Sequence, residues 1–126
     1  VEQDAQRAAK LLRGAAAGGY ASAQFNLAFL HLQGQGVPRD VARAQELLAE
    51  AASGGHTMAM TNLGWLYEGG AGQPRRPAEA EFWFRKAAEI GDAEAARRLA
   101  RLLKAEGRAA EAEAVQAGAA GQRSEL

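Results

Sequence analysis

The sequence predicts an all-α fold, a right-handed α-α superhelix (α-solenoid) of about seven helices that stack as antiparallel pairs. The first observation is an internal repeat, since residues 23–55 recur 36 positions later as residues 59–91, and such a period indicates a solenoid. The second is that the repeated residues are mostly small or apolar at helical spacing, with Gly and Pro between the helices. The identical positions are Ala23/Ala59, Asn26/Asn62, Leu27/Leu63, Leu30/Leu66, Gly34/Gly70, Gly36/Gly72, Pro38/Pro74, Arg39/Arg75, Ala42/Ala78, Ala44/Ala80, Ala51/Ala87, Ala52/Ala88 and Gly55/Gly91.

Length and composition fit one repeat domain without an extreme charge. The chain has 126 residues, and 15 Lys and Arg balance 15 Asp and Glu, so no net field draws it to nucleic acid or to an anionic membrane. The absence of cysteine excludes a disulfide framework and a Cys-based zinc site. All apolar runs are far shorter than the roughly 20 residues that a membrane span needs.

Residues 1–19 are predicted to form a single helix that corresponds to the second helix of the repeat. Shifting Asp40, Leu48 and Gly54 back by 36 positions gives Asp4, Leu12 and Gly18. From this register we expect one face to point inward and the other to lie mostly in solvent. The inward residues are Ala8, Leu11, Leu12 and Ala15, and the solvated ones are Glu2, Gln3, Gln6, Arg7 and Lys10.

The first complete repeat, residues 20–55, contains a first helix (A-type) and a second helix (B-type). The A-type helix is expected over residues 21–33, because Ala23, Leu27 and Leu30 form a core stripe at i, i+4 and i+7. Gly34 suits a left-handed C-cap there. Asp40 is then a good N-cap for the B-type helix, which runs to about residue 53.

The second repeat, residues 56–91, restates these elements with larger side chains. Its A-type helix is expected over residues 57–68, and Pro77 can take the first position of its B-type helix. Gly64, in the middle of the A-type helix, should cost about 1 kcal/mol relative to Ala in helix propensity. A close approach of the B-type helix is therefore expected at Gly64.

The third repeat, residues 92–118, is shortened. Asp92 is a clear N-cap, and Leu99 and Leu102 keep the core register of the A-type helix. The loop shrinks to a turn around Gly107, and the Ala-rich B-type helix suits a terminal cap. Residues 119–126 show no periodicity and are expected to form a flexible tail.

These residues resemble a known family. The first copy contains Ala23-Gln24-Phe25-Asn26-Leu27-Ala28-Phe29-Leu30-His31, and the second contains Phe82-Trp83-Phe84-Arg85-Lys86-Ala87-Ala88 followed by Gly91-Asp92. They are similar to the Sel1-like repeat, a relative of the tetratricopeptide repeat with a longer loop between its helices. Departures are His31 in place of Tyr, Gln73 in place of Val, and the short third loop.

The resemblance implies a non-enzymatic scaffold that binds a protein or peptide partner. Bacterial members are commonly linked to the cell envelope, secretion or host contact. The compartment is left open, and a bacterial periplasmic, secreted or cytoplasmic location is compatible with the sequence. A monomer is the default oligomeric state.

No catalytic, metal-binding or cofactor-binding constellation is identified. His31 and His56 are the only histidines, and neither has a metal-ligand or catalytic spacing. They are interpreted as a helix-face residue and a turn residue. The glycines around Gly34 and Gly70 follow helices rather than strands, and no Gly-Lys-Ser/Thr motif occurs, so they are interpreted as loop residues and not as a phosphate cradle.

A candidate partner-binding surface lies beside the core stripe of the A-type helices, where the superhelix would have its concave face. Asparagine can bond both groups of a peptide backbone, and neighbouring aromatic side chains add anchoring area. An equally weighted alternative is that the aromatic residues pack between repeats and the asparagines bond nearby turns. The candidates are Asn26, Phe29, Gln33, Asn62, Trp65, Arg98 and Arg101.

The third A-type helix is also basic, since it carries Arg97, Arg98, Arg101 and Lys104. Such a face could hold an acidic peptide through bidentate arginine contacts. A charged face that simply stays in solvent is favoured over this interpretation.

Three functions follow from the sequence. The leading hypothesis is an adaptor that binds a partner through the concave face. The alternative is a spacer or regulatory repeat module of a longer bacterial envelope- or secretion-associated protein. RNA binding by a helical repeat is less favoured, because the net charge is zero and the aromatic content is modest.

Overall fold

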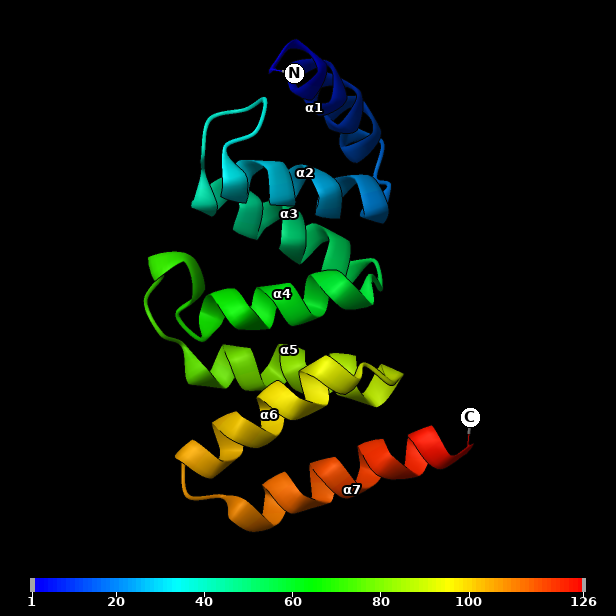
Figure 1. The fold of residues 1–126 in the computed structure, drawn as a ribbon, viewed down its shortest axis with the longest axis vertical. Helices are drawn as coiled ribbons and strands as arrows, with labels where there is room; N and C mark the ends of the chain where they lie inside the picture. The colour runs from blue at the N-terminus through cyan, green and yellow to red at the C-terminus, as the bar shows by residue number, and fades with distance from the viewer. Residues whose placement is uncertain (1, 126) are drawn as a thin grey trace. The chain divides into compact units, whose positions relative to one another are not determined.

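A computed structural model describes the backbone of residues 2–125 and the side chains of residues 3–119. Within this range it has seven α-helices, one 3-10 turn and no strand, and adjacent helices pack in pairs (Figure 1). The predicted all-α fold class is thus confirmed. The elements are α1 (Glu2–Ala17), α2 (Ala21–Gln33), α3 (Val41–Ser53), α4 (Thr57–Tyr67), η1 (Gly70–Gly72), α5 (Pro77–Ile90), α6 (Ala93–Ala105) and α7 (Ala109–Glu125).

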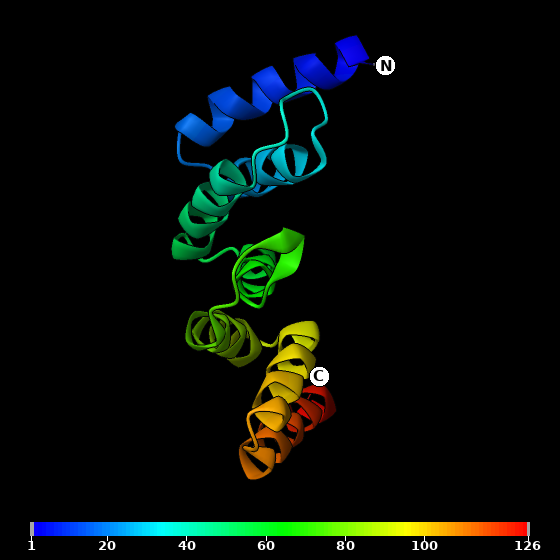
Figure 2. The same cartoon turned by 90° about the vertical axis from the view of Figure 1, so that its left-hand side faces the viewer.

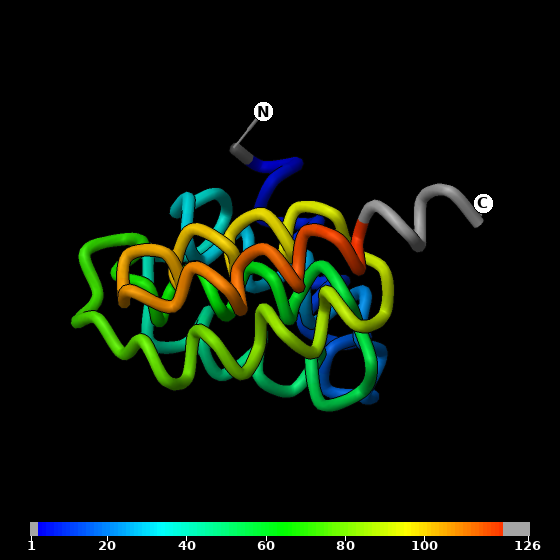
Figure 3. Tube along the Cα trace, turned by 90° about the horizontal axis from the view of Figure 1, so that it is seen from below, coloured from blue at the N-terminus to red at the C-terminus, as the bar shows by residue number. Residues whose placement is uncertain are grey.

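The chain divides into two compact units, residues 1–63 and residues 64–126, with the boundary inside α4. In the first unit, α2 packs against both α1 and α3. In the second unit, α6 packs against both α5 and α7, and Figure 3 shows α6 and α7 side by side and antiparallel. Each unit is therefore built around an A-type helix that lies between two B-type helices.

The predicted helix caps are present. Gly34 ends α2 with φ 70, in the left-handed region. The carboxylate of Asp40 accepts a hydrogen bond from the backbone N–H of Arg43 at 3.0 Å, and that of Asp92 accepts one from Glu94 at 3.1 Å. Pro77 occupies the first turn of α5. These local signals set where the helices begin and end because they satisfy backbone groups that the helix leaves unpaired.

The loop between α2 and α3 is closed onto the end of α2. The backbone N–H of Asp40 donates to the carbonyl of His31 at 3.0 Å, and Nδ1 of His31 lies 3.2 Å from the carbonyl oxygen of Pro38. The loop also reaches α1 (Figure 2), where a Cβ placed on Gly36 would lie 2.4 Å from the carbonyl oxygen of Ala5. Contact between the loop and α1 therefore requires glycine at this position.

Phe84 is the largest fully buried side chain of the second unit. Its ring lies against the backbone of Gly64, where an added Cβ would be 2.6 Å from Cε1 of the ring. The close approach of the B-type helix that was predicted at Gly64 is confirmed. Glycine is used here because the ring fills the space that any side chain would take.

The structure corrects the predicted inward face of the first helix. Ala8 and Leu11 are exposed, with Leu11 76% exposed, whereas Ala9 and Ala16 are buried; Leu12 and Ala15 are half-buried. The prediction assumed that α1 has the same neighbours as a B-type helix in a complete repeat. It was wrong because α3 is covered by α2 on the side that corresponds to Leu11, whereas no described helix covers that side of α1.

Two smaller differences concern helix ends. The A-type helix of the second repeat ends at Tyr67, one residue before the expected end, and its loop continues as η1. The backbone of α7 is helical to Glu125, beyond the expected end at residue 118. The expected tail therefore begins within this helix, and its side chains after residue 119 lie outside the described residues.

The two histidines have structural roles. The ring of His56 stacks on that of Phe25, with centroids 4.7 Å apart and planes 23° from parallel. Its Nδ1 accepts a hydrogen bond from the backbone N–H of Ala59 at 3.1 Å, so His56 caps α4. His31 contacts the loop after its own helix, as described above. Both placements agree with the helix-face and turn interpretations made from the sequence.

Candidate partner-binding surface

The clearest candidate surface lies on α2 in the first unit. Asn26, Phe29 and Gln33 follow one another at helical spacing and are all exposed, with Phe29 47% exposed. Neither amide side chain makes a hydrogen bond with any other residue that the structure describes. Behind this row, Leu27 and Ala28 are buried. The row is therefore a free polar and aromatic strip on a helix that its neighbours hold from two sides.

The second repeat divides its predicted residues between the two units. Asn62 is half-buried in the part of α4 that belongs to the first unit. Trp65, in the second unit, is also half-buried, and a Cβ placed on Gly70 would lie 2.4 Å from its Cδ2. The indole thus packs on the loop after its own helix. Part of its area is used in holding η1 and is unavailable to a partner.

The basic face of α6 is partly neutralised by one glutamate. Nε of Arg98 donates to Oε1 of Glu94 at 2.8 Å, and Nη2 of Arg97 donates to Oε2 at 2.6 Å. These bonds, the one from Arg97 first, lower the pKa of Glu94 below its ordinary value. Arg101 is exposed and forms no ion pair with a described residue. Of the two predicted arginines, Arg101 is thus the one whose charge is available.

Two clefts that the sequence did not reveal lie between B-type helices over an A-type helix. The one in the first unit has a volume of about 460 Å³, and the one in the second unit about 340 Å³. Their floors are equivalent, since Gln24 and Leu27 in the first lie two repeats before Ala96 and Leu99 in the second. Aligning the repeats could have shown that the residues of the A-type helices at the two floors are equivalent. The walls come from the B-type helices, and their positions depend on how the helices pack.

Gln24 lines the cleft in the first unit together with the charged side chains of Arg13, Arg43 and Glu50. The side chain of Gln24 is buried, and its Nε2 donates to Oε2 of Glu50 at 3.2 Å and to the carbonyl oxygen of Ala16 at 3.4 Å. Gln24 therefore connects α1, α2 and α3. The bonds satisfy a buried amide that would otherwise be costly to remove from water.

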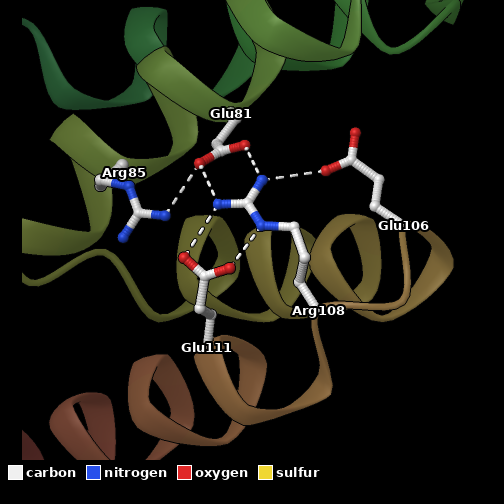
Figure 4. A network of polar contacts seen from close by, with 5 residues as sticks. All are labelled: Glu81, Arg85, Glu106, Arg108 and Glu111. Atoms are coloured by element: carbon white, nitrogen blue, oxygen red, sulfur yellow. Dashed lines mark hydrogen bonds and ion pairs between the residues drawn. The ribbon is translucent and has the colours of Figure 1, made fainter.

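A charged network joins α5 to the start of α7 (Figure 4). Nη1 of Arg108 donates to Oε1 of Glu81 at 2.6 Å and to Oε1 of Glu106 at 3.1 Å. Its guanidinium also pairs with Glu111, and Arg85 donates to Glu81 at 3.0 Å. The hydrogen bonds from Arg108 lower the pKa values of Glu81 and Glu111 below the ordinary value of a glutamate. The network holds together the turn that replaces the long loop of the other repeats.

We expect the substitution Arg108→Gln to make the thermal stability of the protein depend less on pH in the acidic range. A carboxyl whose pKa is lowered by folding stabilises the fold above its unfolded pKa and loses that contribution as the pH falls through the folded pKa. The wild type should therefore lose thermal stability between about pH 5 and pH 3, and the variant should lose less over the same range. The measurement is the unfolding midpoint as a function of pH at low salt.

Arg97→Gln is the matched control for this experiment, because among the described residues Arg97 pairs only with Glu94 of its own helix. It should change the profile less than Arg108→Gln, which also removes the link from α7 to α5. Addition of 1 M salt should narrow the difference, since exposed charges are screened. Identical pH profiles for the wild type and Arg108→Gln would contradict this account of the network.

Neither a metal site nor a membrane span is found in the part of the chain that the structure describes. Among these residues, no group of three or more His, Asp or Glu side chains is placed to hold a metal ion. No described helix is both long enough and apolar enough to cross a bilayer. The described geometry offers surfaces and clefts for binding, and the exposed row on α2 is the one that is least engaged within the chain.

Comparison with known proteins gives one family. The model of the Sel1 repeat matches residues 1–20, 21–56 and 57–92. No curated protein matches the sequence.

Two solved structures are similar to most of the chain. One is c5321 of Escherichia coli, described as a protective antigen of uropathogenic strains with an SLR fold; it is 31% identical over 97% of this chain, with a TM-score of 0.82. Another is a Sel1 repeat protein from Oxalobacter formigenes, 32% identical over 82% of this chain, with a TM-score of 0.74. This chain spans only 27% and 42% of their lengths.

Proposed function

Because the chain belongs to the Sel1 repeat family, we propose that it is a non-enzymatic adaptor that binds a protein or peptide through the exposed faces of its A-type helices. Sel1 repeats generally mediate protein interactions, and the family is typically a non-catalytic scaffold. Beyond this family role, the proposal names the binding surface. It is the side of the A-type helices beside their core stripe, which the repeat register assigns to the concave face.

The observation that carries the proposal is the free row on α2. Phe29 exposes a large apolar surface between two amides, Asn26 and Gln33, that have no hydrogen-bond partner among the described residues. An amide side chain can donate to a backbone carbonyl and accept from a backbone N–H. An aromatic side chain beside it can anchor a partner, because such residues dominate interface energetics. This combination favours an extended peptide with an apolar side chain.

The support behind the row makes it suitable for binding. α2 lies between α1 and α3, and its Ala23, Leu27 and Ala28 are buried. A rigid helix keeps the exposed side chains in place, so binding does not have to order the backbone. In the second unit, the exposed cation Arg101 lies on the A-type helix α6, and there it is the candidate for binding a carboxylate.

We expect the double substitution Asn26→Ala and Phe29→Ala to lower the affinity for the partner by at least tenfold, which is about 1.4 kcal/mol. The partner is first identified by affinity capture and cross-linking with the intact chain. Its affinity for the wild type and the variant is then measured by titration calorimetry. Both residues are exposed, so the variant should keep its thermal stability.

Phe82→Ala is the matched control, because Phe82 is 51% exposed and lies on α5, a B-type helix. It removes the same kind of side chain at nearly the same exposure and should leave the affinity unchanged. Trp65→Ala is a poorer test, since its indole also supports Gly70. A partner that binds the Asn26→Ala/Phe29→Ala variant as tightly as the wild type would exclude the α2 row as the binding surface.

A further inference from the structure

The clefts of the two units are equivalent in the repeat register but differ in charge. On one wall, Arg13 of α1 corresponds to Arg85 of α5, two periods later. On the other wall, the shortened third repeat places Glu111 of α7 where the first unit has Arg43 of α3. At these positions the first cleft has an arginine on each wall, whereas the second has an arginine opposite a glutamate.

The two arginines of the first cleft are available to a ligand. Arg13 is exposed and forms no ion pair with a described residue. Arg43 pairs with Glu46 of its own helix at 3.0 Å, but the two side chains are 44% and 66% exposed, and such a surface pair contributes little. In the second cleft, by contrast, the charges at both positions are used in the network of Figure 4.

The floor of the first cleft adds a hydrogen-bond acceptor. Gln24 is 7% exposed, and its Nε2 donates to Glu50 and to the carbonyl oxygen of Ala16. Two acceptors beside the nitrogen fix the orientation of the amide. The Oε1 atom has no hydrogen-bond partner among the described residues, and the same part of the chain contains no fully buried polar side-chain atom that lacks one. Oε1 is therefore reached from the cleft that Gln24 lines.

The repeat does not require a polar residue at the position of Gln24. The same position is Met60 one period later and Ala96 two periods later, and both are buried. Apolar side chains thus pack there without a hydrogen bond, whereas a buried amide costs free energy that its bonds must offset. Since Gln24 also leaves its oxygen unbonded within the chain, this position points to a ligand that donates a hydrogen bond.

We propose that the first cleft binds a carboxylate that has an amide N–H beside it, as in a glutamyl residue of a peptide. A guanidinium binds a carboxylate through two parallel N–H donors, and Arg13 and Arg43 offer one on each wall. Oε1 of Gln24 accepts the N–H of the peptide from the floor. Glu50 lines the same cleft, so a single acidic group is favoured over a run of them, because like charges repel.

The size and place of the cleft fit this ligand. Its volume of about 460 Å³ lies in the range of sites for small ligands. No residue of the α2 row lines it. The inference therefore goes beyond the proposed function and does not depend on it.

The probe is the peptide acetyl-Ala-Glu-Ala-amide, which is titrated into the intact, isotope-labelled chain and followed by NMR. We expect saturable shifts around the first cleft, including the side-chain amide of Gln24, and none around the second cleft, which is the internal control. The same peptide with glutamine in place of glutamate should bind at least tenfold more weakly, because it offers no charge to the two arginines.

Three variants test the named side chains. The double substitution Arg13→Gln and Arg43→Gln should weaken binding of the glutamyl peptide by at least tenfold, and the fold should be kept because both residues are exposed. Gln24→Met introduces the residue found one period later and should weaken binding by about threefold to tenfold, the effect of one hydrogen bond. Arg7→Gln is the matched control, since Arg7 is an exposed arginine of α1 that does not line the cleft; it should leave the affinity unchanged.

Any of four results would overturn the proposal. The first is equal affinity for the glutamate and glutamine peptides, and the second is unchanged affinity in the double arginine variant. The third is the absence of a saturable shift around the first cleft up to about 10 mM peptide, weaker than any specific site of this kind. The fourth is a set of shifts centred on Asn26 and Phe29, which would place the peptide on the α2 row instead.

Discussion

Phe84→Ala is expected to lower the free energy of unfolding by about 3–5 kcal/mol, the range for removing a buried aromatic ring. Phe84 is 0% exposed and is the largest fully buried side chain. Its ring contacts the backbone of Gly64, a surface with no side chain that could move in to fill the cavity. Chemical denaturation followed by circular dichroism measures the change.

The control for Phe84→Ala is Phe82→Ala, two residues away on the same helix and 51% exposed. Its effect should stay within about 0.5 kcal/mol, as is usual for surface positions. A loss of similar size in both variants would show that stability depends on the helix rather than on the buried ring.

The contact between Gly64 and Phe84 can be tested further by a double-mutant cycle. Gly64→Ala should gain about 1 kcal/mol in helix propensity, but its Cβ would lie 2.6 Å from the ring of Phe84. We expect overpacking, which costs about 1–3 kcal/mol, to exceed this gain. In the background of Phe84→Leu the clash should be relieved, so the two substitutions should be non-additive.

Gly36→Ala is expected to destabilise the first unit by about 2–5 kcal/mol, the sum of the costs of a left-handed backbone and of an overpacked contact. Gly36 has φ 72, and an added Cβ would lie 2.4 Å from the carbonyl oxygen of Ala5. Because the obstacle is backbone, relief requires α1 to move away from the loop. Hydrogen exchange in α1 should accelerate together with the loss of stability.

Gly34→Ala separates the two contributions. Gly34 has nearly the same backbone, with φ 70, but the nearest atom to an added Cβ is 3.4 Å away and belongs to a side chain. The Gly34→Ala variant should lose only about 1–2 kcal/mol of stability, the cost of placing a non-glycine residue in the left-handed region. The amides of α1 should keep their protection from hydrogen exchange. Equal losses at the two glycines, with α1 unaffected in both, would contradict a contact between the loop and α1.

Local features of the fold could be predicted from the sequence because each depends on residues that are close in the chain. Asp40 and Asp92 cap helices by bonding to backbone groups two or three residues away. Gly34 ends a helix by its own conformation. Gly64 could be connected with a close helix because a glycine in mid-helix lowers helix propensity and is usually kept for close packing.

The candidate site was predictable in position and less so in availability. Helical spacing placed Asn26, Phe29 and Gln33 beside the core stripe, and all three are exposed. The same spacing could not show that Trp65 rests on Gly70 or that Glu94 holds Arg98. Those contacts depend on a loop conformation and on rotamers, which the repeat pattern does not specify.

The sequence alone determined the all-α class, the helix pairs, the helix caps and the family, since a 36-residue period and turn residues act within each repeat. Only the tertiary structure decided which copy of a repeated face is buried. Leu11 and Leu47 occupy the same repeat position, yet Leu11 is 76% exposed and Leu47 is 1% exposed. The reason is physical: periodicity records which face of a helix is apolar, whereas burial requires a neighbouring helix that covers it.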